Sequence, residues 1–153
     1  MRRKDREMDR AFAENVFDAC TFATLSTVSS DGTPYAVPVS IAREGGSVYF
    51  HCALEGKKID NLRFNNKVCL SCVGKTHIPE KKFTIGFESA IAFGTACEIS
   101  NEEEKIHALR LISLRYMPDN MENFDDAVSR TLKAVGVWKV HIDSISGKQN
   151  KTE

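Results

Sequence analysis

The residues with the clearest chemical potential are a histidine, a cysteine and two lysines grouped around one glycine. They occur in the run His51-Cys52-Ala53-Leu54-Glu55-Gly56-Lys57-Lys58. Gly56 ends a predicted strand, and the two lysines begin a predicted short helix, whose first backbone N–H groups have no partner within the helix. Such N–H groups and lysine ammonium groups together bind phosphate well. The sequence therefore predicts an anion-binding corner at Lys57 and Lys58, with a solvated lysine pair on a surface helix as the alternative.

A strand with one face of small residues is the second feature of interest. Ala36, Pro38 and Ser40 alternate with Val37 and Val39. Proline cannot donate a ladder hydrogen bond, so Pro38 indicates either an edge strand or a place that another group occupies. We therefore predict that a flat ring lies against this face, or else that the strand is an edge that its proline protects from aggregation.

Cys69 and Cys72 have the C-x-x-C spacing of redox and zinc sites. On a predicted strand over residues 67–73, however, positions three apart point to opposite faces, so the two sulfurs share neither a metal nor a disulfide unless the strand bulges. We predict two core cysteines, with a zinc site as the alternative. The chain has five cysteines, an odd number that does not indicate a disulfide framework.

The composition excludes several classes of protein. The 153 residues are 42% hydrophobic and 27% charged, which is typical of one globular domain rather than of a disordered or fibrous chain. Lysine plus arginine number 21 and so do aspartate plus glutamate, so no overall field attracts nucleic acid. No apolar run approaches the roughly 18 to 20 residues of a membrane span, and the charged N-terminus is unlike a signal peptide. We expect a soluble, cytoplasmic protein that binds neither nucleic acid nor a membrane.

Hydrophobic periodicity predicts the elements that must position these residues. Helices are predicted over residues 5–20, 57–63, 102–116 and 124–132, and six strands over 22–28, 35–42, 47–53, 67–73, 87–99 and 135–142. Gly94 predicts a bulge in the longest strand, and the polar tail 147–153 is expected to fray. Because the strands are mostly consecutive, we predict one mainly-β domain of the α+β class over residues 1–153. It would have an N-terminal helix (1–20), a six-stranded antiparallel barrel with inserted helices (21–146) and the tail.

Four segments of the sequence resemble the pyridoxamine 5'-phosphate oxidase-like flavoproteins, and among these the nitroimidazole-resistance (Nim) proteins. The segments are residues 1–7, Gly32–Ser40, Tyr49–Leu62 and Ser89–Ala96. The resemblance implies a split β-barrel that binds FMN, and a homodimer with FMN at the interface. The arginine-rich C-terminal motif of the oxidase proper is not found in this sequence, so pyridoxamine phosphate is not the expected substrate.

The resemblance also implies a role for particular residues. The strand carrying Val37, Pro38, Val39 and Ser40 would line the flavin ring, which His51 and Cys52 would flank. Lys57 and Lys58 would hold the FMN phosphate, in agreement with the anion-binding corner predicted from the helix start. The remaining cofactor-binding positions implied are Ser89, Trp138 and Lys148, the last two across the dimer.

The expected function is FMN-dependent electron transfer from a small donor, such as a nicotinamide, to a small acceptor, such as a nitroaromatic compound. His51 is the expected catalytic residue, because an imidazole beside a flavin can donate a proton or position the acceptor near neutral pH. The alternative from another class is a non-catalytic dimeric module that binds a flavin or haem as a sensor or carrier.

Overall fold

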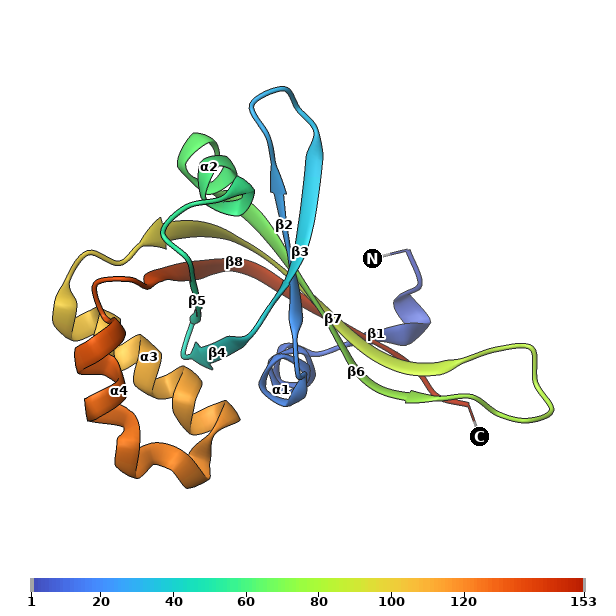
Figure 1. The fold of residues 1–153 in the computed structure, drawn as a ribbon. Helices are drawn as coiled ribbons and strands as arrows, with labels where there is room; N and C mark the ends of the chain where they lie inside the picture. The colour runs from blue at the N-terminus through green and yellow to red at the C-terminus, as the bar shows by residue number, and fades with distance from the viewer. Residues whose placement is uncertain (1, 153) are drawn as a thin grey trace.

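One open antiparallel sheet dominates the computed structural model, which describes residues 2–152 (Figure 1). Within these residues the sheet has eight strands: β1 (Glu7–Met8), β2 (Ala23–Val28), β3 (Pro34–Val39), β4 (Ile41–Glu44), β5 (Ser47–Cys52), β6 (Lys67–His77), β7 (Gly86–Glu98) and β8 (Gly136–Asn150). The strand order is β3-β2-β6-β7-β8-β5-β4, and β1 pairs with β8 outside this path. The predicted mainly-β antiparallel split-barrel class is thus confirmed.

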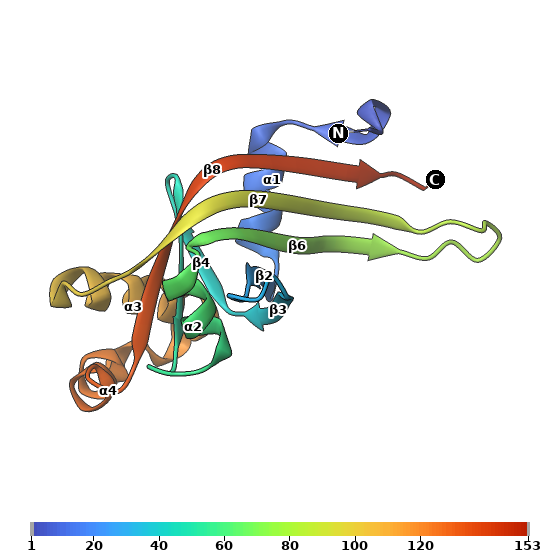
Figure 2. The same ribbon diagram turned by 90° about the horizontal axis from the view of Figure 1, so that it is seen from above.

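Helices cover the sheet in separate places. The α-helices of residues 2–152 are α1 (Arg10–Ala19), α2 (Lys57–Phe64), α3 (Glu102–Tyr116) and α4 (Phe124–Thr131), with short 3-10 turns at Lys4–Arg6 and Pro118–Asn123. Helix α1 packs across β6, β7 and β8, whereas α3 packs against β4 and β5. Figure 2 shows β6, β7 and β8 side by side, with α3 and α4 at the end away from the β6–β7 connection.

Two hydrophobic clusters follow from the side-chain alternation of β5. Val48 and Phe50 point into the main cluster, which α1 and the sheet enclose. Tyr49 points the other way, into a second cluster under α3 that includes Ile112 and Val137. A strand buried on both faces therefore separates the main core from the α3 side.

The prediction of six strands was too low. The predicted strand 35–42 is two strands that meet at Ser40, because β3 pairs with β2 while β4 pairs with β5. β1 has only two residues and pairs with Gly147 and Lys148, which is too short to leave a periodic signal in the sequence.

The predicted ends of the chain also need correction. Helix α1 begins at Arg10 rather than at residue 5, because the Asp9 carboxylate accepts a hydrogen bond from the Phe12 backbone N–H at 2.8 Å and caps the helix there. Residues 147–150 are not a frayed tail but the last part of β8, where β7 pairs on one side and β1 on the other. Strand β6 likewise continues to His77, four residues beyond its predicted end at residue 73.

The predicted bulge at Gly94 is confirmed. The register between β7 and β8 shifts between Phe93 and Gly94, and the two backbones come very close there. A Cβ built on Gly94 would lie 2.7 Å from Val140 Cγ1 and closer still to the His141 carbonyl oxygen. This close approach excludes every other residue type unless the strands shift.

We predict that Gly94→Ala destabilises the protein by about 1 to 3 kcal/mol, the usual range for overpacking a rigid site. Chemical denaturation measures the difference in the free energy of unfolding. Gly46→Ala is the matched control, because a Cβ built there meets no atom of residues 2–152 within 4 Å. Equal stability of the two variants would contradict the role given to the close approach.

Candidate functional site

The first turn of α2 faces open space. Gly56 precedes it with a φ of 128°, a conformation that glycine adopts without strain. Among residues 2–152, no side chain caps the start of the helix, and a Cβ on Gly56 would meet no atom within 4 Å. The donor set of unpaired N–H groups with Lys57 and Lys58 therefore fits a phosphate group.

Three contacts hold α2 in place behind this turn. Ile59 and Leu62 are buried in the main core. Asn61 is buried too, and its side-chain amide donates a hydrogen bond to Thr27 Oγ1 of β2 at 3.0 Å. Arg63 forms an ion pair with Glu98 at the end of β7, at 3.1 Å. The helix is thus anchored on β2 and β7 behind its first turn.

His51 and Cys52 end β5 and lie next to Lys58. His51 keeps an exposed surface, but partial desolvation of its ring and then the Lys58 ammonium lower its pKa, so the imidazole favours its neutral form. Burial raises the pKa of the Cys52 thiol, while Lys58 opposes that effect. The charge of Lys58 therefore acts on both residues at the end of β5, although His51 faces the α3–α4 side and Cys52 packs against the main core.

A cavity of about 300 Å³ lies between His51 and the α3–α4 pair. His51 lines it from β5, and mostly apolar residues line the rest: Leu109, Ile112, Ser113, Met117, Phe124, Ala127, Val128, Thr131 and Val135. Hydrophobic periodicity predicts the two helices, 102–116 and 124–132, that carry most of these residues. It did not indicate that these helices leave a cavity opposite His51, because that depends on how two helices pack.

The β2–β3 turn approaches the same corner. The Thr33 backbone N–H donates to the Asp31 carboxylate at 2.9 Å and, with a smaller contribution from Lys57, lowers the pKa of Asp31. Strand β3 is an edge of the sheet, as Pro38 predicted. Ala36 and Pro38 are exposed, and Val37 packs on the main core. The small-residue face is thus open on an edge strand near Lys57.

The remaining predicted positions lie elsewhere in the chain. Ser89 and Lys148 are cross-strand partners on β7 and β8. Ser89 also pairs with Val73 of β6. Val73 lies six residues, or about 20 Å, along β6 from Lys67, where the strand begins after α2. Trp138 is 3% exposed and belongs to the main core. Within one chain, Ser89 and Lys148 lie away from Lys58, whereas Trp138 pairs with Phe50 of β5, next to His51.

Comparisons with known proteins agree with this geometry. Residues 9–149 match the sequence model of the family described as pyridoxamine 5'-phosphate oxidase, and the chain belongs to this family. It is similar to a candidate 5-nitroimidazole antibiotic resistance protein from Bacteroides thetaiotaomicron, with 30% identity, a TM-score of 0.80, and coverage of 94% of this chain and 86% of that one. The search of curated proteins gives no match.

Two further solved structures share the fold at lower identity. The flavocytochrome Anf3 from Azotobacter vinelandii is 24% identical, with a TM-score of 0.78 over 94% of this chain and 68% of that one. A protein from Mycobacterium smegmatis that binds FAD and haem is 20% identical, with a TM-score of 0.83 over 96% and 74%. Within residues 2–152, no helix is both long and apolar enough to span a membrane.

We predict that His51 titrates below the ordinary histidine pKa of about 6.5. Lys58→Gln should raise the pKa of His51, because a positive charge that acts on the imidazole is removed. Lys57→Gln should leave the pKa of His51 unchanged, because the charge of Lys57 acts on Asp31. NMR titration of the imidazole protons measures both.

The lowered pKa also sets the sign of a pH effect on stability. The unfolded chain takes up the His51 proton first as the pH falls, so this contribution to stability is present above about pH 6.5 and is lost below it. A His51 pKa at or above 6.5 would contradict the burial and charge argument.

Proposed function

We propose that this protein is an FMN-dependent oxidoreductase that transfers electrons to a small acceptor, such as a nitroaromatic compound. The observation that carries the proposal is the uncapped first turn of α2, with its two lysines, of which Lys58 acts on His51. Membership of the pyridoxamine 5'-phosphate oxidase family supports it, as does similarity to the 5-nitroimidazole resistance candidate.

In this proposal each part of the corner has one task. The N–H groups of the first turn and the lysines hold the FMN phosphate. The open face of β3 between Val37 and Ser40 lies against the flavin ring, and Cys52 closes the site from β5. When bound, FMN would supply the capacity to accept and pass on two electrons. The protein orients the ring and controls what approaches it.

His51 connects the flavin site with the apolar cavity. A neutral imidazole can donate a hydrogen bond to a polar group of an acceptor that enters the cavity. It can also give its N–H proton to the acceptor while its other ring nitrogen takes up a proton from water. A volume of about 300 Å³ suits one small ring compound. We therefore assign the acceptor to this cavity, with His51 as its catalytic partner.

A homodimer completes the proposal. The outer face of β6 and β7 carries exposed apolar side chains, of which Val73 is 60% and Phe93 56% accessible to solvent. Ser89 and Lys148 lie on the same face, since Ser89 pairs with both Val73 and Lys148. A second copy covering this face would bring Ser89 and Lys148 of one subunit toward the flavin of the other. A sedimentation mass of a single chain would contradict the dimer.

The second candidate function is a flavin- or haem-binding module without turnover. The similarity in fold to a protein that binds FAD and haem favours it. In that case the α2 corner would still bind a phosphorylated flavin or another anionic ring compound, and the cavity would take no acceptor.

The decisive experiment measures FMN and riboflavin binding by flavin fluorescence. We expect Lys57→Gln/Lys58→Gln to weaken FMN binding on the order of a hundredfold, because two charge-assisted contacts of about 1.5 kcal/mol each are lost. Riboflavin lacks the phosphate, so its affinity should not change. The control Lys81→Gln/Lys133→Gln removes two exposed lysines outside α2 and should bind FMN as the wild type does. Equal losses for both flavins would contradict the phosphate corner.

Turnover then separates the two functions. The FMN-loaded wild type should oxidise NADH or NADPH repeatedly in the presence of a nitroaromatic acceptor. His51→Ala should retain FMN but reduce the nitroaromatic more slowly. Tight FMN binding with no turnover would favour the binding module, and unchanged turnover in His51→Ala would remove the role given to His51.

A further inference from the structure

Two buried cysteines far apart in sequence meet in the main core. Cys20 follows the last residue of α1, and Cys72 lies on β6. Their sulfur atoms are 3.3 Å apart, and both are free thiols, with exposures of 4% and 0%. The partner of Cys72 is thus Cys20 and not Cys69, which lies on the opposite face of β6, as the spacing predicted. Cys69 is only half-buried and is not among the core residues of the described chain, so the prediction of two core cysteines was wrong for Cys69.

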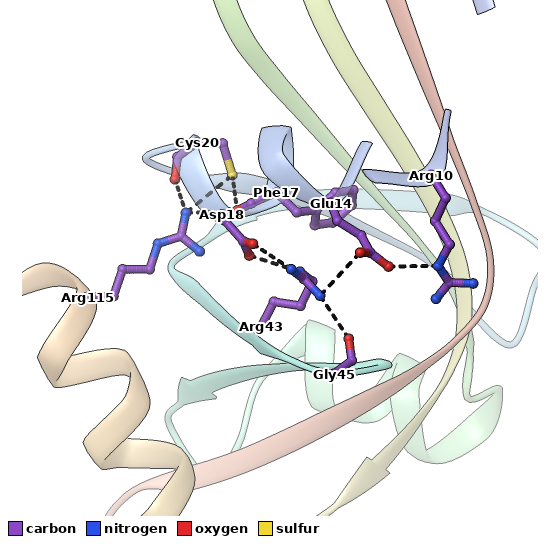
Figure 3. A network of polar contacts seen from close by, with 8 residues as sticks. All are labelled: Arg10, Glu14, Phe17, Asp18, Cys20, Arg43, Gly45 and Arg115. Carbon is purple, nitrogen blue, oxygen red and sulfur yellow. Dashed lines mark hydrogen bonds and ion pairs between the residues drawn. The ribbon is translucent and has the colours of Figure 1, made fainter. Parts of the chain in front are cut away.

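An arginine from a third element points at the same place. The Arg115 guanidinium of α3 donates hydrogen bonds to the carbonyl oxygens of Phe17, at 2.9 Å, and of Cys20. The same nitrogen lies 3.8 Å from Cys20 Sγ (Figure 3). A positive charge at this distance favours the thiolate, which is the reactive form of cysteine.

The other charged groups nearby are occupied with one another. Asp18 of α1 forms an ion pair with Arg43 of β4 at 2.5 Å, and Arg43 also contacts Glu14. Figure 3 shows both carboxylates turned toward Arg43. The hydrogen bond between the two sulfurs and the charge of Arg115 together lower the pKa of Cys20 to about 7, and the same hydrogen bond and burial raise the pKa of Cys72.

We propose that Cys20 and Cys72 form a dithiol site that a peroxide oxidises to a disulfide. Cys20 is the thiol that attacks the peroxide, Cys72 is the resolving thiol, and Arg115 is the positioning residue that stabilises the Cys20 thiolate. The site is separate from the proposed flavin corner and does not depend on it. Its oxidant is hydrogen peroxide, which is small enough to reach a thiol that is nearly buried.

The chemistry balances in two steps. The Cys20 thiolate attacks one oxygen of the peroxide, the O–O bond breaks, Cys20 becomes a sulfenic acid, and the released hydroxide takes up the thiol proton as water. The Cys72 sulfur then attacks the Cys20 sulfur, an S–S bond forms, the S–O bond breaks, and a second water leaves. Two thiols lose two electrons and two protons, and one peroxide is reduced to two waters.

The test treats the reduced full-length protein with hydrogen peroxide, then denatures and alkylates it for mass spectrometry. We expect a mass loss of about 2 Da before alkylation, the alkylation of three of the five cysteines, and a linked peptide pair that contains Cys20 and Cys72. Dithiothreitol should restore the two thiols. A disulfide that maps to another pair, or oxidation confined to the exposed Cys97, would overturn the proposal.

Variants identify the role of each residue. Cys20→Ser and Cys72→Ala should both lose the disulfide, whereas the control Cys97→Ser should form it as the wild type does. Circular dichroism checks that each variant folds, and the peptide map of the wild type decides the question even if one does not.

Arg115 needs a readout that a purely structural role would not change. Arg115→Gln should slow disulfide formation about tenfold at pH 7 and move the midpoint of the rate-against-pH profile upward, because less of Cys20 is thiolate. Arg115→Lys should restore part of the rate. An unchanged pH profile in Arg115→Gln would remove Arg115 from the site.

Discussion

The close backbone contact at Gly94 is the constraint on which much of the structure depends. Only a residue without a side chain lets β7 approach the β8 backbone at His141 while the register shifts by a bulge. On the N-terminal side of Gly94, β7 forms a long arm with β6 and the second half of β8, and there β1 pairs with the free edge of β8. On the other side of Gly94, the first half of β8 pairs with β5 instead. The bulge at Gly94 therefore lies between the long arm and the part of the sheet where β8 pairs with β5, the strand that carries His51.

The C-terminal end of α3 is the second fixed point. Tyr116 places its hydroxyl between the Thr21 carbonyl oxygen, 2.9 Å away, and the Ile41 backbone N–H, 3.1 Å away. Arg115 satisfies the carbonyl oxygens at the end of α1. Two adjacent residues thus tie α3 to the start of β4 and to the joint between α1 and β2. The same helix forms a wall of the His51 cavity, so the cavity and the dithiol share one support.

Local patterns predicted much of the fold and part of the site. The strand 87–99, the bulge at Gly94 and the start of α2 after Gly56 follow from neighbouring residues. The split at Ser40 and the polar end of β8 do not, because partner strands far along the chain decide them. The contact between Cys20 and Cys72 spans 52 positions, and no local spacing signals it.

The place of β3 and β4 has a consequence for how this chain folds. They are neighbours in sequence, joined through Ser40, yet they lie at the two opposite edges of the strand order. A covalent link therefore ties both edges, and neither edge is in place until distant pairings such as Ala23 with Cys72 and Ser47 with His141 have formed. Such non-local pairing makes folding slow compared with that of a helical protein of equal size. The half-made sheet, with unpaired edges, is the state in which a cell must protect this chain from self-association.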